Sequence, residues 1–248
     1  MSKLANIKWK HYINYIVVGI FTIVTSILAF GGGLQQSLIY KLEEVAINII
    51  LAVSLSLVVG FLGELSLGHA GFMCVGAYLG GKAAALLVPV LGNGIPTLLI
   101  SLLIGGICAG LCGFIIGIPA LRLKGDYLAI TTLAFGEIVR TIFQNTSAES
   151  FGGAIGLKTP RFDKHYFFIL CFVIVLLTLA VVQNLIRSKH GRAITAIRDN
   201  EIAARATGIN VTSYKLIGFI VSAIFAGLAG VLFSYTQNNV SSSTFDYN

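Results

Sequence analysis

The chain has 248 residues, of which 56% are hydrophobic and only 11% are charged, and its mean hydropathy is +0.88. A soluble domain carries roughly 25% charged residues, so this composition excludes an ordinary soluble protein and predicts an all-α, polytopic membrane protein. The net charge of +7 would point to nucleic acid in a soluble chain. Here the basic residues stand mostly at the ends of apolar runs, so no nucleic-acid partner is expected.

Apolar runs recur along the whole chain, and a run of ~18 residues is enough to cross a bilayer. The first run follows several lysines and precedes Ala29 and Gly31, a pattern also found in signal peptides, but its length favours an uncleaved span. The four cysteines fall inside the runs and are expected to be small buried hydrophobes. The seven expected spans are 13–30, 45–62, 71–88, 97–118, 126–144, 166–186 and 215–235.

The orientation of these spans follows from the lysines and arginines between them. With the N-terminus inside, ten of these residues fall in inside segments and four, namely Lys41, Lys158, Arg161 and Lys164, fall outside. Because cytoplasmic loops carry the excess of positive charge, the N-terminus is expected in the cytoplasm. The long loop 187–213 is then cytoplasmic as well.

The stretch "GELSLGHAGF", residues 63–72, interrupts the apolar pattern between the second and third spans. It places Glu64, Ser66, Gly68 and His69 close together, and its glycines lower the cost of leaving a helix. A broken helix at membrane depth exposes backbone groups to a cavity or a ligand, so these four residues are candidates for a transport pathway. The alternative is a short cytoplasmic turn with solvated side chains, which the topology alone slightly favours.

The stretch "GDYLAITTLAFGEIVR", residues 125–140, carries Glu137 and Arg140 on one helix face. A lone charge in hydrocarbon costs about 3 kcal/mol on insertion scales, and pairing reduces that cost. The pair either lines a polar pathway or reaches the outer membrane surface. Neither polar stretch assembles a catalytic triad, a zinc-ligand spacing or a phosphate-binding loop, so an enzyme site is not expected.

The polar stretch "GRAITAIRDNEIAARATGIN", residues 191–210, lies between the last two spans. Its apolar spacing predicts two short helices, the second capped by Asp199 or Asn200 and ended by Gly208. Helices this short are marginal alone, so we expect them to dock against a partner. The alternative is a loop that rests on the bilayer surface.

"EIAARATG" resembles the EAA loop of ABC-importer permeases, with Glu201, Ala203, Ala204 and Gly208 at the motif positions. The longer stretches "GELSLGHAGF", "GDYLAITTLAFGEIVR", "GGAIGL", "GRAITAIRDNEIAARATGINV" and "KLIGFIVSAIFAGLAG" resemble the branched-chain amino-acid permease family of these importers, and its LivM-like members in particular. The resemblance runs from about residue 45 to the end of the chain. It implies a permease domain over 45–248, preceded by an N-terminal span and external loop over 1–44.

The resemblance implies a non-enzymatic transport subunit in a bacterial-type cytoplasmic (inner) membrane. Expected partners are a second, LivH-like permease subunit, two cytoplasmic ATPases that bind ATP, and an external substrate-binding protein, while this chain holds no cofactor. Expected substrates are branched-chain or related amino acids, or else urea or short amides. The coupling loop 187–213 would contact the ATPases through Arg198, Asp199, Glu201, Ile202, Ala203, Ala204, Arg205 and Gly208.

Two other classes stay open. An ion-coupled secondary transporter or channel could use Glu64, His69 or the Glu137–Arg140 pair, although no inverted repeat supports it. A membrane enzyme or scaffold is the third class. Family members usually continue with further spans beyond "SSSTFDYN", so the chain is expected to be C-terminally truncated.

Overall fold

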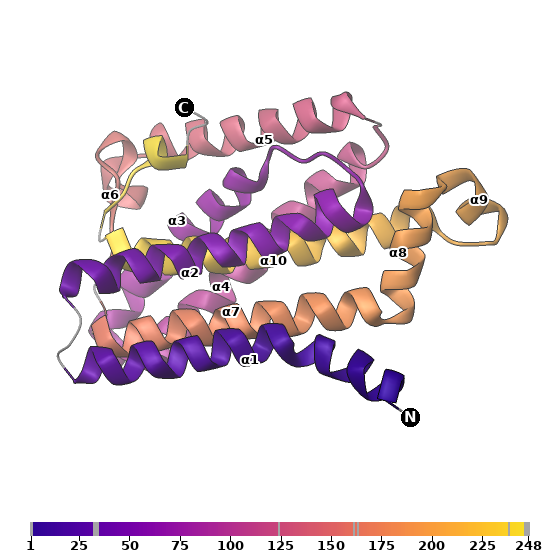
Figure 1. The fold of residues 1–248 in the computed structure, drawn as a ribbon. Coiled ribbons are helices and arrows are strands. Elements are labelled where there is room, and N and C mark those ends of the chain that lie inside the picture. The colour runs from indigo at the N-terminus through magenta and orange to yellow at the C-terminus, as the bar shows by residue number, and fades with distance from the viewer. Residues whose placement is uncertain are drawn as a thin grey trace.

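The computed structural model describes residues 2–31, 35–123, 125–160, 162, 164–237 and 239–245, and for residues 2–12, 30, 164 and 165 it describes the backbone alone. Lys124 and Arg161, counted above in the loop charges, lie outside the described residues. The described chain is almost entirely helical (Figure 1), which confirms the expected all-α bundle. Its long helices are α1 (Ser2–Phe30), α2 (Gln36–Ser56), α3 (His69–Leu91), α4 (Ile95–Ala120), α5 (Asp126–Gln144), α7 (Lys164–Arg187) and α10 (Val211–Gln237).

Shorter elements join the long helices. The π-helix η1 (Leu57–Leu62) continues α2, and α8 (Lys189–Asp199) and α9 (Glu201–Ala206) form the expected pair of short helices before α10. At the other end of the bundle, β1 (Leu157–Lys158) pairs antiparallel with β2 (Asn239–Val240). The remaining short elements are α6 (Ala148–Phe151), η2 (Gly153–Ile155) and η3 (Ser242–Phe245).

Helix α10 is the centre of the bundle and packs against α2, α3 and α4. Its approach to α3 depends on small residues, because a Cβ on Gly76 would overlap the backbone of Gly227. Such close backbone contact supplies the van der Waals packing that holds helices together where lipid gives no hydrophobic drive. The expected role of glycine in bundle packing is therefore visible at the α3–α10 crossing.

Among the described residues, five helical segments are long and apolar enough to cross a membrane: Gln36–Leu62, His69–Leu91, Ile95–Ala120, Tyr166–Arg187 and Val211–Gln237. The expected spans 13–30 and 126–144 are helical too, but Ile13–Ala29 is a shorter apolar segment and α5 carries Asp126, Glu137 and Arg140. The count of seven spans and the cytoplasmic N-terminus stay predictions.

The bundle has two distinct ends. In Figure 1 the start of α1 lies at the same end as α8 and α9, whereas α6 and η3 lie at the opposite end.

Between the two ends, the outward face of α4 carries a row of exposed apolar side chains, as expected for contact with lipid: Leu99, Leu103, Ile107, Leu111 and Ile115. The α9 end and the α6 end are the two places where polar segments gather.

Candidate functional site

The stretch 63–72 forms a break between two helices that folds back into the bundle. Helix η1 ends at Leu62, Gly63 takes a left-handed conformation with φ +73°, and α3 begins only at His69. Nε2 of His69 lies 2.8 Å from Oγ of Ser54, which stands about 12 Å before the end of η1 at ~1.5 Å per residue. Figure 1 shows this segment turning back between α2 and α5. Helix α3 therefore starts inside the bundle, and the stretch is not a simple solvated turn.

Helix α5 holds the inner end of this extended segment. The backbone N–H of Leu67 donates to Oγ1 of Thr132 at 3.0 Å. Gly68 passes so close to the Thr132 carbonyl that a Cβ there would overlap it. Ser66 is buried, and its hydroxyl has no hydrogen-bond partner within the described part of the chain. Non-helical backbone at this depth is stable only inside protein or against a water-filled cavity.

Helices α8 and α9 form because each has a capping side chain. Oγ of Ser188 accepts the backbone N–H groups of His190 and Gly191 at the start of α8. Of the two capping candidates for α9, Asn200 is the cap, since its Oδ1 accepts from the Ala203 N–H at 3.0 Å. Gly208 follows α9 with φ +85° and ends the turn as the sequence predicted.

Helix α9 turns one small face inward and a larger apolar face outward. Ala204 is buried and packs with Ile197 and Val211. On the opposite side Ile202 is 81% exposed, and Ala203 is exposed beside it. Because α9 projects beyond the ends of the long helices (Figure 1), this apolar face is free to meet another protein.

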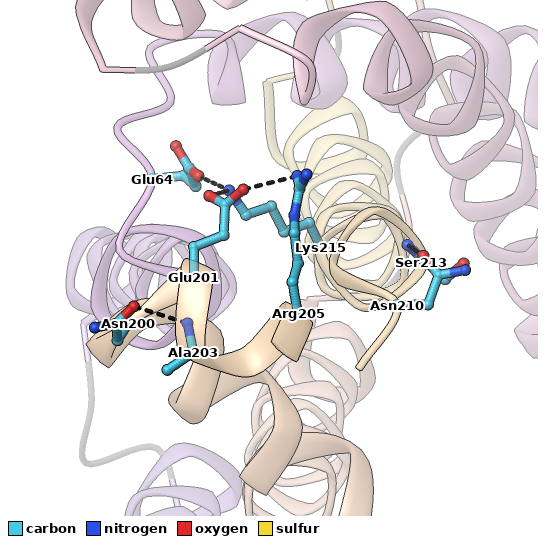
Figure 2. A network of polar contacts seen from close by, with 8 residues as sticks. All are labelled: Glu64, Asn200, Glu201, Ala203, Arg205, Asn210, Ser213 and Lys215. Atoms are coloured by element: carbon cyan, nitrogen blue, oxygen red, sulfur yellow. Dashed lines mark hydrogen bonds and ion pairs between the residues drawn. The ribbon is translucent and has the colours of Figure 1, made fainter. Parts of the chain in front are cut away.

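A chain of charged side chains links the helix break to α9 (Figure 2). Nζ of Lys215, in the second turn of α10, pairs with Oε1 of Glu64 and lies 3.1 Å from Oε2 of Glu201. Nη2 of Arg205 lies 2.9 Å from Oε1 of Glu201. The Lys215 side chain is only 6% exposed and that of Glu64 13%. The two carboxylates are thus balanced by the lysine and the arginine, and the lysine ammonium contacts both carboxylates.

Arg198 makes a second link between α8 and the helix break. Its Nη1 donates to the Gly60 carbonyl at 2.9 Å, and its Nη2 lies 3.0 Å from Oδ1 of Asp199. The Gly60 carbonyl belongs to the last turn of η1, where helix carbonyls lack intrahelical partners. A cavity of about 420 Å³ lies beside this link, and its lining includes Arg198, Asp199, Glu64 and Ile202.

The structure brings together two groups of residues that the sequence treated as separate. Glu64, a candidate for the pathway, shares a lysine with Glu201, a candidate for coupling. Glu137 and Arg140 do pair, at 2.7 Å, but on α5 and away from this cluster. Whether any of these residues serves transport or coupling stays a prediction.

Sequence reasoning missed three polar residues, Lys215, Glu44 and Asn48, which take part in ion pairs or line a cavity in the structure. Lys215 was treated as the first residue of a span, yet it is the centre of the ion pairs. Glu44 was assigned to a loop before a span at 45, whereas α2 begins at Gln36 and contains both Glu44 and Asn48. The signal for the last two was the i, i+4 placement of a carboxylate and an amide on one face of an apolar helix.

The fold and the site together define a class: a multi-pass helical membrane protein with an interrupted helix and a polar helical loop at one end. The family described as "Branched-chain amino acid transport system / permease component" matches residues 37–248, starting before the boundary expected at residue 45. The chain belongs to this family of permeases. No solved structure matches the chain.

Curated relatives agree with this assignment. The chain is 38% identical over 232 residues to the high-affinity branched-chain amino acid permease protein LivM of Escherichia coli K12, an alignment that covers 81% of this chain and 53% of the relative. It is 31% identical over 107 residues to a probable LivH permease of Methanocaldococcus jannaschii, with 43% and 34% covered. It is 27% identical over 208 residues to the ribose import permease protein RbsC of Escherichia coli K12, with 77% and 59% covered. The chain spans about half the length of the LivM relative that it matches.

Proposed function

We propose that this chain is a permease subunit of a binding-protein-dependent ABC importer for branched-chain or related amino acids. The observation that carries the proposal is α9, a short helix with an outward apolar face that projects from the end of a membrane bundle. The helix is tied by Lys215 to a broken membrane helix. A docking helix joined to a break in the bundle is what a transporter driven by a separate motor protein needs.

The motor partners in this proposal are two cytoplasmic ATPases, which bind and hydrolyse the ATP. Ile202 and Ala203 would enter a groove of one ATPase, because both are exposed and apolar. Glu201, Arg198 and Arg205 would set the position of α9 rather than meet the ATPase first, since each is engaged within the chain. The α9 end then faces the cytoplasm of a bacterial-type inner membrane, and an external substrate-binding protein would approach the α6 end.

A second permease subunit is proposed to cover α5. One side of α5 is uncovered and carries exposed Ile138 together with Glu137, whose side chain is 38% exposed despite its pairing with Arg140. A partly exposed ion pair is costly against lipid and favourable against a polar pathway or a partner chain. Similarity to permeases named LivM and LivH supports a pair of related permease subunits.

The rival hypothesis of an ion-coupled transporter is less well supported by the geometry. Glu64, its natural ion-binding group, already holds the Lys215 ammonium and is largely buried. A transported cation would first have to displace that lysine. The importer proposal needs no such exchange.

Crosslinking tests the importer proposal directly. Ala203→Cys is placed in a chain whose native cysteines are replaced, and a thiol-specific crosslinker is applied in native membranes. We expect mass spectrometry to recover an ATPase carrying the phosphate-binding motif GxxxxGK[ST]. The matched control is Ile155→Cys, which is 73% exposed at the opposite end and is expected to capture no ATPase.

A bulky side chain gives a second test at the same position. Ala203→Trp is expected to abolish capture of the ATPase from the neighbouring position Ile202→Cys while membrane insertion is unchanged. Equal capture from Ile202→Cys and Ile155→Cys, or capture that survives Ala203→Trp, would contradict the assignment of α9 as the docking helix.

A further inference from the structure

A cavity of about 250 Å³ lies between α2, α3, α10 and η3, far from the ion pairs at the α9 end. One face of α2 supplies Glu44, Asn48 and Leu51 to its lining, at the i, i+4 and i+7 positions. Phe233 of α10 and Phe245 of η3 are among the residues that complete it. The lining thus combines three polar side chains with five apolar ones: Glu44, Asn48 and Thr244, and Ile47, Leu51, Met73, Phe233 and Phe245.

Glu44 and Asn48 lie on an exposed face of a candidate membrane span, where contact with lipid would be unfavourable. Segment Gln36–Leu62 is a candidate span of 27 residues with a mean hydropathy of 2.6, and Asn48 lies about 18 Å from its start at ~1.5 Å per residue. Both Glu44 and Asn48 are exposed in the single chain. A carboxylate exposed to hydrocarbon is costly and marks a functional position by default. This face of α2 is therefore suited to water, a polar ligand or a partner chain rather than to lipid, and the adjoining cavity favours a ligand.

Glu44 accepts one hydrogen bond at the edge of the cavity. Nε2 of Gln237, the last residue of α10, donates to Oε1 of Glu44 at 3.3 Å. The other carboxylate oxygen remains able to accept from a ligand, since an ionised carboxylate accepts several hydrogen bonds. A side-chain amide four residues further along, on Asn48, offers two N–H donors within about 6 Å on the same helix face.

We propose that this cavity is a membrane-depth binding subsite for an α-amino acid with an apolar side chain. The ammonium group of the amino acid pairs with Glu44, and its carboxylate accepts from the Asn48 amide. The apolar side chain packs against Leu51, Phe233 and Phe245. The volume is below the 300–1,000 Å³ typical of drug-sized ligands and suits one small molecule. The inference rests on the proposed function and adds a place in the bundle where the substrate is recognised.

The lining discriminates between the substrate classes carried by related permeases. A neutral sugar offers hydroxyl groups on every side and has no ammonium to pair with Glu44, so the apolar wall would leave part of those hydroxyls unpaired. An amino acid with a branched side chain has one charged end and one apolar end, which match the Glu44–Asn48 pair and the mainly apolar remainder of the lining. One turn beyond Leu51, Ser54 bonds His69 at the break, so the subsite and the break share one side of α2.

Accessibility of an introduced thiol tests the subsite without any transport assay. Asn48→Cys is compared with Ile107→Cys in the full chain, purified into lipid nanodiscs with the native cysteines replaced. Asn48 and Ile107 lie twelve residues after the starts of α2 and α4, so their depths match, and Ile107 is 58% exposed on the lipid-facing row of α4. A charged methanethiosulfonate reagent, which needs a hydrated thiolate, is expected to label Asn48→Cys and to leave Ile107→Cys unlabelled.

Protection by ligand completes the test. The reporter for binding is Thr244→Cys, because Thr244 lines the cavity and is exposed, and the proposal gives it no ligand contact, so Asn48 stays intact. L-Leucine is expected to slow the labelling of Thr244→Cys, and ribose and L-glutamate are expected to have no effect. Added to that variant, Glu44→Gln is expected to raise the half-protecting concentration of L-leucine by about tenfold or more, because a charge-assisted contact is lost. Asp126→Asn, a charge loss outside the cavity lining, serves as the control and is expected to leave that concentration unchanged.

Each contrary result overturns a defined part of the argument. Equal absence of labelling at both positions would show that this face of α2 does not meet water. Labelling that L-leucine does not slow, or that ribose slows equally, would show a polar lumen without an amino-acid subsite. The outcome at Ala203 stays separate: capture of an ATPase without protection at Thr244→Cys refutes the subsite alone, and failure of both refutes the importer as well.

Discussion

Replacing Lys215 by methionine removes the cation that the helix break and α9 share. The ammonium pairs with Glu64 and Glu201 and is nearly inaccessible to water. Because methionine has a similar volume, the substitution mainly removes a positive charge and leaves the packing nearly unchanged. Glu64 and Glu201 would then face each other without the ammonium between them, and Arg205 would remain as a counter-charge at 2.9 Å from Oε1 of Glu201.

The magnitude follows from the burial of the groups. Removing one partner of a buried ion pair costs about 3–5 kcal/mol, because the remaining charge is left uncompensated. A chain of this size loses roughly 2–4 °C of melting temperature per kcal/mol, so Lys215→Met is expected to lower the Tm by about 6–20 °C. Arg205→Met is the matched control: the Arg205 side chain is 62% exposed, and an exposed pair contributes at most about 1 kcal/mol.

The assay is thermal denaturation of the purified chain in detergent, followed by the loss of the monodisperse peak on size exclusion. A third variant combines Lys215→Met with Glu64→Gln and Glu201→Gln, which removes the unpaired charges. Because a buried ion pair can be replaced by neutral groups at little net cost, most of the lost stability is expected to return. Equal melting of Lys215→Met and Arg205→Met, or no recovery in the triple variant, would refute the role given to these charges.

Two further predictions concern the backbone at the same end of the bundle. Gly68→Ala is expected to destabilise the fold by about 1–3 kcal/mol, since the new Cβ overlaps the Thr132 carbonyl; Gly60→Ala, which meets no atom within 4 Å, is the control, and equal melting of both would contradict this close approach. Asn200→Ala is expected to weaken α9 by about 1 kcal/mol through loss of its cap. Hydrogen exchange at residues 203–206 would then accelerate by about fivefold, and Asn200→Asp would retain protection.

The helices and the paired loop helices could be predicted from the sequence because their signals are local. Apolar run lengths place the long helices, and the predicted run 126–144 coincides with α5. The cap at Asn200 and the left-handed Gly208 follow from residue types that favour those positions. The Glu137–Arg140 contact follows from helical spacing alone.

The features that join distant segments could not be predicted in this way. Lys215 contacts Glu64 across 151 positions of sequence, and no periodicity encodes that pairing. Similarly, "GELSLGHAGF" is compatible with a solvated turn until the contact of His69 with Ser54 shows that α3 starts inside the bundle. Asn48 looks like a single polar residue in an apolar run until α10 and η3 enclose a cavity beside it.

The relation between α9 and the helix break depends on charge more than on packing. Helix α9 has six residues and buries only Ala204, so its apolar contacts constrain its orientation weakly. The Lys215 ammonium, in contrast, is shared by one carboxylate from α9 and one from the break. If an ATPase moves α9 through Ile202, the separation of Glu201 from Lys215 leaves the ammonium with Glu64 alone. Residues 63–68 lie between η1 and α3 and belong to neither helix, so the break is the part of the bundle that such a movement reaches first.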